Sequence, residues 1–313
     1  MKKLLLLCVI AGMLLTTFSC SKRDRDSVVV AQQFGLGYAP LVVMQEQKLI
    51  EKYYPSAKVE WAQLGSGGAI REAMASGQVD VGSMGVPPYL IAWANDYDFR
   101  VISALCEMPL GMQTNRPEVR SLKDITPDMK IATPSPGSIQ HILLSMASEK
   151  ELGDPTALDR NVIAMAHPDG ASALINHIEI AAHFTAPPYI FVELEAEGIH
   201  QVVDAEKDAF GEPFTFLVTT GTAAFRERNP ELFDAVRKAL KEAIDIMENN
   251  PESVADIVAP TMNLDKETYL KYCNWPGVHF VTNPRGMLKF LDFMNKAGYV
   301  NKMTQNEHDL IWE

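Results

Sequence analysis

Residues 63–88, QLGSGGAIREAMASGQVDVGSMGVPP, decide the fold of this chain. They contain two strand-to-helix turns in succession, at residues 65–68 and 84–86. Glycines at such turns let backbone N–H groups approach a ligand, and they aim the positive end of the next helix at it. Both turns fall at carboxyl ends of strands, where open α/β sheets bind small molecules. The stretch predicts a ligand held by main chain and helix ends, whereas the alternative is that the glycines only close tight loops.

Strands and helices alternate outward from this stretch. The first series predicts strands over 28–32, 57–63, 79–83 and 99–105, with helices over 39–53, 68–76 and 87–94. A second series predicts strands over 130–133, 161–165, 180–184 and 201–203, with helices over 138–150, 170–176 and 188–197. Such alternation is typical of mostly parallel sheets covered by helices. The predicted fold class is therefore α/β with two lobes.

Two segments between the series are predicted to be the crossings of a hinge. They cover residues 108–117 and 211–219, so lobe 2 (108–216) is inserted into lobe 1 (28–107 and 217–313). After residue 219 the pattern is almost entirely helical. Helices are expected to begin at Asn229-Pro230, Asn250-Pro251, Asp265 and Asn283-Pro284.

Composition is typical of a globular protein with substantial cores. The chain has 313 residues, of which 47% are hydrophobic and 22% charged. Its formal net charge of −12 argues against nucleic acid or an anionic membrane surface as a direct partner. A small anion is still compatible with this charge, because local dipoles can outweigh a distant acidic surface.

The N-terminus has the anatomy of an export signal. Lys2 and Lys3 precede an apolar run over residues 4–15, which is too short to span a bilayer comfortably. Cys20 follows Ser19 as in a bacterial lipobox, so residues 1–19 are predicted to be a signal peptide and Cys20 a lipid anchor. Residues 20–27 would then be a tether at the extracytoplasmic face of a membrane. Simple secretion into the periplasm is the alternative.

The remaining thiols, Cys106 and Cys273, lie far apart in the sequence and lack metal-ligand spacing. Two buried free thiols are predicted, with a disulfide as the alternative in an oxidising compartment.

The histidines do not form a catalytic or metal-binding pattern. There is no HExxH, CxxC, phosphate-loop lysine, GxSxG or dinucleotide-binding fingerprint. His141 and His167 lie near predicted turns of lobe 2 and are expected to donate hydrogen bonds to a ligand rather than to act as bases. We predict no catalytic residue, no metal and no cofactor.

The turn at residues 133–139 of lobe 2 repeats the logic of the first lobe. Ser135 or Ser138 can cap the following helix, and amides near Gly137 are placed to receive an anion. Helix capping alone is the alternative. A further turn at 184–189 parallels residues 86–89 of the first lobe. The aromatic residues near these turns either line the cleft or pack beside it; they are Tyr38, Tyr89, Trp93 and Tyr189.

Five stretches in this order resemble one known family: GYAPLVVMQEQKLIEKYYP, LGSGGAIREAMASGQVDVGSMGVPP, KIATPSPGSIQHILL, IEIAAHFTAPPYIFVELEAEG and FMNKAGYV. These stretches are similar to the periplasmic solute-binding components of ABC importers for nitrate, sulfonates, taurine and thiamine precursors, often called SsuA/TAUA-type or NMT1-like. The resemblance covers nearly the whole mature chain. It implies a two-lobed type II periplasmic binding protein, a monomer that closes on a small-molecule solute and docks on a permease with its ATPase. Carried over residue by residue, it implies ligand contacts at Phe34, Gly35, Tyr38, Gly65, Ser66, Gly67, Gly68, Ser83, Met84, Gly85, Ser135, Gly137, Ser138, Phe184 and Thr185.

One departure concerns the ligand. Many relatives have an acidic residue before the proline of the last turn, whereas Ala186 stands here. Few basic residues lie in the predicted loops, so the expected solute is a monoanionic or neutral organic molecule, of the sulfonate, taurine or nitrate type or a thiamine-precursor heterocycle. The alternatives are an enzyme on the same scaffold, of the menaquinone or thiamine-pyrimidine biosynthesis type, and an extracytoplasmic sensor.

Overall fold

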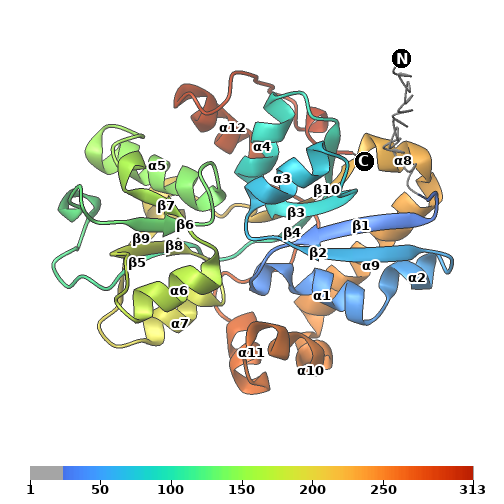
Figure 1. The fold of residues 1–313 in the computed structure, drawn as a ribbon, viewed down its shortest axis with the longest axis horizontal. Helices are drawn as coiled ribbons and strands as arrows, with labels where there is room; N and C mark the ends of the chain where they lie inside the picture. Colours follow the sequence, from blue (N-terminus) through green and yellow to red (C-terminus); the bar gives the residue numbers. More distant parts are fainter. Residues whose placement is uncertain (1–23, 313) are drawn as a thin grey trace, which may run out of the picture.

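The structure, a computed structural model, describes residues 24–312 and consists of two lobes side by side, each a five-stranded sheet with helices on both faces (Figure 1). The predicted signal peptide and Cys20 lie outside the described residues. In the described part of the chain, no helix is long and apolar enough to cross a membrane.

The first sheet has the strand order β2-β1-β3-β10-β4. Four of its strands point the same way, because β10 is antiparallel to both neighbours, β3 and β4. Its strands are β1 (Ser27–Gln32), β2 (Lys58–Gln63), β3 (Val81–Gly85), β4 (Phe99–Cys106) and β10 (Leu217–Thr222). Its helices are α1 (Ala39–Glu46), α2 (Leu49–Tyr53), α3 (Gly67–Ala75) and α4 (Val86–Ala94).

The predicted helix over 39–53 is two helices. Lys48 has a left-handed backbone (φ 50°, ψ 46°), which ends α1 and starts α2 in a new direction. The change of direction buries Leu49 and Ile50 in the core, so packing of these two side chains offsets the strain at Lys48.

The second sheet repeats the arrangement with the order β7-β6-β8-β5-β9. Here β5 is the single reversed strand. Its strands are β5 (Gly111–Thr114), β6 (Ile131–Thr133), β7 (Val162–Ala164), β8 (Ala182–Thr185) and β9 (His200–Asp204). One face is covered by α5 (Ile139–Leu152), and the other by α6 (His167–Ile175) and α7 (Tyr189–Glu195) (Figure 1). The α/β prediction is confirmed, with one reversed strand in each mostly parallel sheet.

Both reversed strands lie partly or wholly in segments that the sequence assigned to the hinge. β5 falls inside residues 108–117, and β10 begins inside residues 211–219. The chain between the sheets therefore runs through residues 107–110 on the way out. It returns through residues 205–216, which include a single helical turn, η4 (Ala205–Phe210).

The C-terminal part is helical, as predicted. It contains α8 (Ala223–Arg228), α9 (Pro230–Asn249), α10 (Ala255–Val258), α11 (Lys266–Cys273) and α12 (Met287–Lys296). Asn229 caps α9 and Asp265 caps α11, whereas α12 begins three residues later than the Asn283-Pro284 signal.

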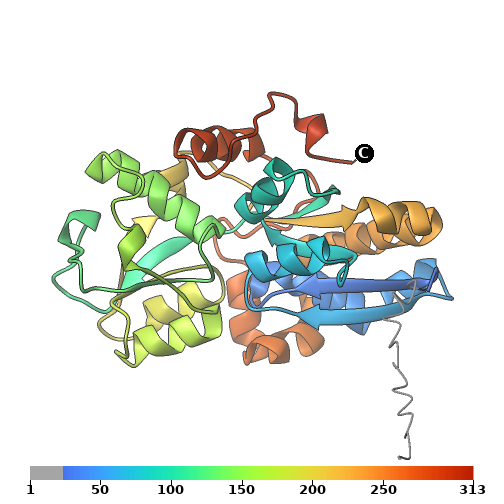
Figure 2. The ribbon, with the colours of Figure 1, turned by 45° about the horizontal axis from the view of Figure 1, so that its top comes forward.

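These helices also contact the second lobe. The Phe290 ring of α12 packs 4.5 Å from that of Phe210 in the return connection, and Figure 2 shows α12 above the junction of the lobes. On the other side, the Tyr272 ring of α11 lies 4.9 Å from Phe191 of α7. The two lobes are therefore linked by packed aromatic side chains as well as by the two connections.

Both predicted free thiols are confirmed. Cys106 and Cys273 are buried and unpaired. Burial raises the pKa of the Cys106 thiol well above its usual value and that of Cys273 to about 11.

Candidate functional site

The glycine turns of the first lobe lie directly against the turns of the second. A Cβ atom added to Gly85 would lie 3.1 Å from Ile139, and one added to Gly68 would lie 3.4 Å from the Ser135 hydroxyl. A backbone hydrogen bond also joins the lobes, since Leu36 N–H donates to the carbonyl of Pro187 at 3.0 Å. The lobes are therefore closed on each other in this conformation.

A small cavity of about 20 Å³ lies where these turns meet. A single water molecule needs about 10–15 Å³ by the same measure, so any larger ligand requires the lobes to separate. The cavity is lined by Gln33, Tyr38, Gly67, Gly85, Pro88, Pro134, Ser138, Ile139, Gln140, His167, Phe216 and Leu217.

Two helix N-termini face this cavity from opposite lobes. In α3 the Ser66 hydroxyl accepts from Ala69 N–H at 3.1 Å, and in α5 the Ser138 hydroxyl accepts from His141 N–H at 3.3 Å. The first two N–H groups of each helix have no partner within the helix. They belong to Gly67 and Gly68 in one lobe and to Ile139 and Gln140 in the other, so the cleft has backbone donors on both walls.

The second glycine turn, at residues 84–86, leaves room for the cavity at Gly85 but supplies no free backbone N–H groups at the start of α4. The N–H of Val86, the first residue of α4, donates to the carbonyl of Phe216 at 3.3 Å, and Pro87 and Pro88 have no N–H. The sequence-based expectation that both turns of the first lobe aim amides at a ligand is wrong for α4. The prolines that make a good first helical turn also remove its donors.

Uncharged polar side chains complete the cavity wall. Gln33 Nε2 donates to the Tyr38 hydroxyl at 2.5 Å, which leaves the phenolic proton free to donate. Burial raises the pKa of Tyr38 well above its usual value, so the phenol stays neutral. Among residues 24–312, no lysine or arginine lines this cavity. The Ser135 hydroxyl is buried beside it without a hydrogen-bond partner in the described part of the chain.

A series of hydrogen-bonded, buried polar side chains, three of them ionisable, runs from the cavity into lobe 2. Gln140 Nε2 lies 3.1 Å from His167 Nε2, and His167 Nδ1 lies 3.1 Å from His183 Nε2. His183 Nδ1 lies 2.5 Å from Glu193 Oε1. Burial lowers the pKa of His183 to about 3 and that of His167 well below its usual value, and it raises the pKa of Glu193. No three potential metal ligands cluster among residues 24–312.

The structure places the predicted site residues in three groups. Those that line the cavity are Tyr38, Gly67, Gly85 and Ser138. Those that lie in or beside the contact between lobes are Gly35, Gly65, Gly68, Ser135 and Gly137, whose added Cβ atoms or own hydroxyl would meet the opposite lobe. Those whose hydrogen bonds stay within one lobe are Ser66, Ser83, His141 and Thr185, although the His141 ring also lies 5.7 Å from that of Tyr299 in the C-terminal segment. Met84 and Phe184 are fully buried.

Two of the residues engaged within one lobe have little capacity left for a ligand. The Ser83 hydroxyl pairs with that of Thr219 at 2.7 Å, and both residues are fully buried. His141 uses both ring nitrogens, one accepting from Gly137 N–H at 3.0 Å and one 3.1 Å from Asp159. Ligand contact at either residue stays a prediction.

Sequence reasoning missed several lining residues. Gln33 lies at the end of β1, and Gln140 is in the first turn of α5. Their positions at a strand end and in a first helical turn were a usable signal, because both places point toward the carboxyl edge of a sheet. Phe216, at the end of the return connection, and Leu217, the first residue of β10, gave no such signal.

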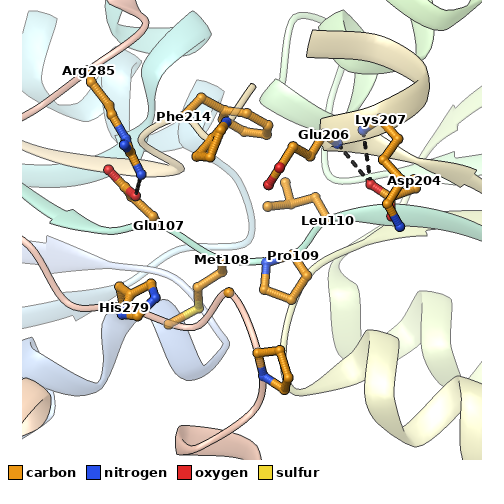
Figure 3. Close-up of a pocket in the computed structure, with 13 residues that line it drawn as sticks. Glu107, Met108, Pro109, Leu110, Asp204, Glu206, Lys207, Phe214, His279 and Arg285 are labelled. Carbon is orange, nitrogen blue, oxygen red and sulfur yellow. Dashed lines mark hydrogen bonds and ion pairs between the residues drawn. The ribbon is translucent and has the colours of Figure 1, made fainter. Parts of the chain in front are cut away.

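A larger cavity, of about 380 Å³, lies at the hinge and not at the glycine turns (Figure 3). Its walls include Glu107 and Pro109 from the outgoing connection and Phe214 from the return. Four of its charged side chains already pair with each other: Arg285 with Glu107, and Lys207 with Asp204 at 3.0 Å. The small cavity is the better candidate because unpaired donors from both lobes converge there.

The two lobes, the double connection and the cleft at the strand ends define a protein of the periplasmic binding protein fold. The chain belongs to the NMT1-like family, whose model matches residues 22–261. This confirms the family predicted from the sequence.

Known relatives agree with this assignment. A protein of Escherichia coli (strain K12) named as an aliphatic sulfonates-binding protein is 23% identical over 276 residues, covering 84% of this chain and 81% of that protein. The alkanesulfonate-binding protein SsuA from Xanthomonas axonopodis pv. citri, bound to MOPS, has a TM-score of 0.72 at 17% identity over 92% of this chain and 98% of that one. The nitrate-binding protein NrtA from Synechocystis PCC 6803 has a TM-score of 0.70 at 16% identity over 89% and 83%. These two solved structures share the fold of this chain.

Proposed function

We propose that this protein is an extracytoplasmic solute-binding lipoprotein of an ABC importer. It captures a small organic anion or a polar heterocycle between its lobes and delivers it to a permease and its ATPase. It acts as a monomer, anchored through a lipid on Cys20, and it is not an enzyme. The names of the relatives support solute binding, since one is named for aliphatic sulfonates and another for nitrate.

One observation carries the proposal. The free N–H groups at the starts of α3 and α5 face one cavity from opposite lobes, and the described residues that line it include no lysine or arginine. Helix N-termini favour anions, and the absence of lysine and arginine from the wall favours a single negative charge or none. An alkanesulfonate, nitrate or a neutral pyrimidine fits this chemistry better than a multiply charged anion.

The proposed ligand class can be tested by thermal-shift screening of residues 21–313 against methanesulfonate, butanesulfonate, taurine, nitrate, bicarbonate and aminopyrimidines. A ligand at one hundred times its Kd stabilises the folded protein by about 2.7 kcal/mol, which moves the melting temperature by several degrees. The Tyr38→Phe variant is the matched control, because it removes one hydroxyl from the cavity and keeps the ring. A shift that is smaller in this variant supports binding at the cleft, and no shift with any of these compounds would contradict the ligand class.

Anchoring and enzymatic activity need separate tests. In cell fractionation, the wild-type protein is expected in the membrane fraction and the Cys20→Ser variant in the soluble periplasmic fraction. If the wild-type protein and the Cys20→Ser variant are both found in the soluble periplasmic fraction, simple secretion explains the location of the protein.

The enzyme alternative is tested with a ligand found by thermal shift. The ligand is incubated with stoichiometric protein and recovered, and recovery of a chemically changed molecule would favour the enzyme alternative.

A further inference from the structure

The buried chain from Gln140 to Glu193 connects the cleft to a carboxyl group that solvent cannot reach. His183 and Glu193 are 0% exposed, His167 is 8% exposed and Gln140 is 3% exposed. The three hydrogen bonds between them are 3.1, 3.1 and 2.5 Å long. Of these four residues, Gln140 and His167 line the cavity, and His183 and Glu193 do not.

The directions of these hydrogen bonds depend on one another. A neutral imidazole has one donor nitrogen and one acceptor nitrogen, so each ring passes on the direction that its neighbour imposes. When Glu193 is ionised, His183 Nδ1–H donates to it, His167 Nδ1–H donates to His183, and His167 Nε2 accepts from the Gln140 amide. When Glu193 is protonated, all three bonds reverse, and His167 Nε2–H donates to the Gln140 carbonyl.

Packing prevents the rings from changing direction by rotation. A Cβ atom added to Gly170 of α6 would lie 2.7 Å from the His183 ring, and the Tyr189 ring stacks on His167 at 5.8 Å. The Thr185 hydroxyl also lies 3.1 Å from His167 Nδ1. A reversal therefore occurs by proton transfer along the chain and not by flipping of the imidazoles.

Among residues 24–312, the ion-pair partner of Glu193 is His183 and not a lysine or arginine, and burial raises the pKa of Glu193. Around Glu193 are the Gln113 amide on β5, which donates to Glu193 Oε2 at 3.1 Å, and His183 on β8. Around His167 are the phenol of Tyr189, whose pKa burial and the charge of Asp169 raise to about 12, and Gln140 of α5. The nearby His141 is paired with Asp159. The carboxyl group thus lies among neutral partners, where it is the place to store a proton.

We propose that Glu193, His183 and His167 form a proton relay that sets whether the Gln140 amide presents a donor or an acceptor to the cleft. In the uptake step, a proton from the cleft bonds to His167 Nε2, the proton on His167 Nδ1 moves to His183 Nε2, and the proton on His183 Nδ1 moves to Glu193 Oε1. Both rings stay neutral at the end of the step. The Gln140 carbonyl is then bonded to His167, and its NH₂ group turns to the cleft.

This inference deepens the proposed function, on which its ligand part rests. A solute whose acceptor oxygens face Gln140 favours the donor form, so it binds together with one proton. By linkage, its affinity falls about tenfold for each pH unit above the pKa of the relay. A neutral solute that donates a hydrogen bond to Gln140 favours the acceptor form, so its affinity falls as the pH drops below the pKa of the relay.

The relay is testable without any ligand. Nitrogen-15 NMR of the histidine side chains, assigned with single His→Gln variants, reports which ring nitrogen carries the proton. Between pH 5 and 9 the two rings are expected to switch together from Nε2–H to Nδ1–H, and neither becomes a cation. In Glu193→Gln the tautomers are expected to be independent of pH. Constant tautomers in the wild-type protein, or a switch of one ring alone, would overturn the relay.

Coupling to the solute is tested by calorimetry in two buffers of different ionisation enthalpy, with methanesulfonate and nitrate as probes. Wild-type protein is expected to take up about one proton per bound anion at a pH above the relay pKa. The Gln140→Leu variant keeps His167, His183 and Glu193 and removes the amide that faces the cleft. It is therefore expected to retain the pH-dependent change of histidine tautomers and to lose proton uptake on anion binding. Binding without proton uptake would overturn the coupling and leave the proposed function standing. Binding of neither probe would overturn the anionic ligand class and the coupling, while the NMR result still decides the relay.

Discussion

Replacing Gly85 by valine is expected to disfavour closure of the lobes without unfolding either lobe. The backbone at Gly85 (φ −58°, ψ 153°) suits any residue, so the change adds no backbone strain. Its Cβ would meet Ile139 of the other lobe at 3.1 Å, and the two γ-carbons must enter a cavity of about 20 Å³. Overpacking of this kind costs about 1–3 kcal/mol. Because separation of the lobes relieves it, the cost falls on the closed state, which corresponds to a roughly 5- to 150-fold loss in any equilibrium that requires closure.

The assay is a distance measurement between spin labels on Ser56→Cys and Glu118→Cys, which are exposed positions in different lobes. The native thiols are buried and will not compete for the label. Gly68→Ala is the matched control, since its Cβ would be 3.4 Å from Ser135, an ordinary contact, and alanine favours the helix. A distance distribution in the Gly85→Val protein that equals that of the wild type, or an equal shift in the control, would refute the closure argument.

Three further predictions concern stability and reactivity. Asp80→Ala leaves Arg228, 3.0 Å away in the wild type, as a partly buried uncompensated charge, so urea unfolding should show a loss of about 3–5 kcal/mol. Lys58→Ala, at an exposed ion pair, is the control and should leave the urea midpoint nearly unchanged. Cys106 and Cys273 are expected not to react with Ellman's reagent at pH 8 until the protein is denatured, because burial raises both thiol pKa values; rapid reaction of the native protein would contradict their placement. The buried histidines have lowered pKa values, so their stabilising effect is complete above about pH 6.5 and is lost as the pH falls toward 3; an acid titration of unfolding that is flat from pH 6.5 to 4 would contradict this.

Local patterns predicted the fold well where structure depends on neighbouring residues. The alternation of strands and helices, the caps at Asn229 and Asp265 and the glycine turns are all readable within a few residues. β5 was not predicted, because its four residues lie between Pro109 and a turn that contains Pro117, and they form a strand only by pairing with β8 and β9. Residues 211–219 were predicted only as a hinge crossing, because the insertion of β10 between β3 and β4 depends on partners more than a hundred residues away.

The candidate site was predictable in outline and not in its polar detail. The turns at residues 65–68 and 133–139 do meet, because carboxyl ends of parallel strands share an edge of each sheet. The buried relay could not be predicted, since His167, His183 and Glu193 belong to three different elements and no spacing rule joins them. Their pKa values shift because tertiary packing excludes water, which sequence alone does not record.

The small number of helix ends with free N–H groups limits how much they can contribute to the free energy of ligand binding. With α4 excluded by its two prolines, α3 and α5 remain, and each contributes at most about 2 kcal/mol to an anion in a partly buried site. A micromolar solute needs about 8 kcal/mol. Hydrogen bonds from Tyr38, Gln33 and Gln140 add roughly 0.5–1.5 kcal/mol each, so the remainder must come from apolar contact with Phe216 and Ile139 at about 25 cal/mol per Å². Affinity should therefore rise along a series from methanesulfonate to butanesulfonate by up to about 0.8 kcal/mol for each methylene that closure buries, and equal affinities along the series would mean that polar groups alone hold the solute.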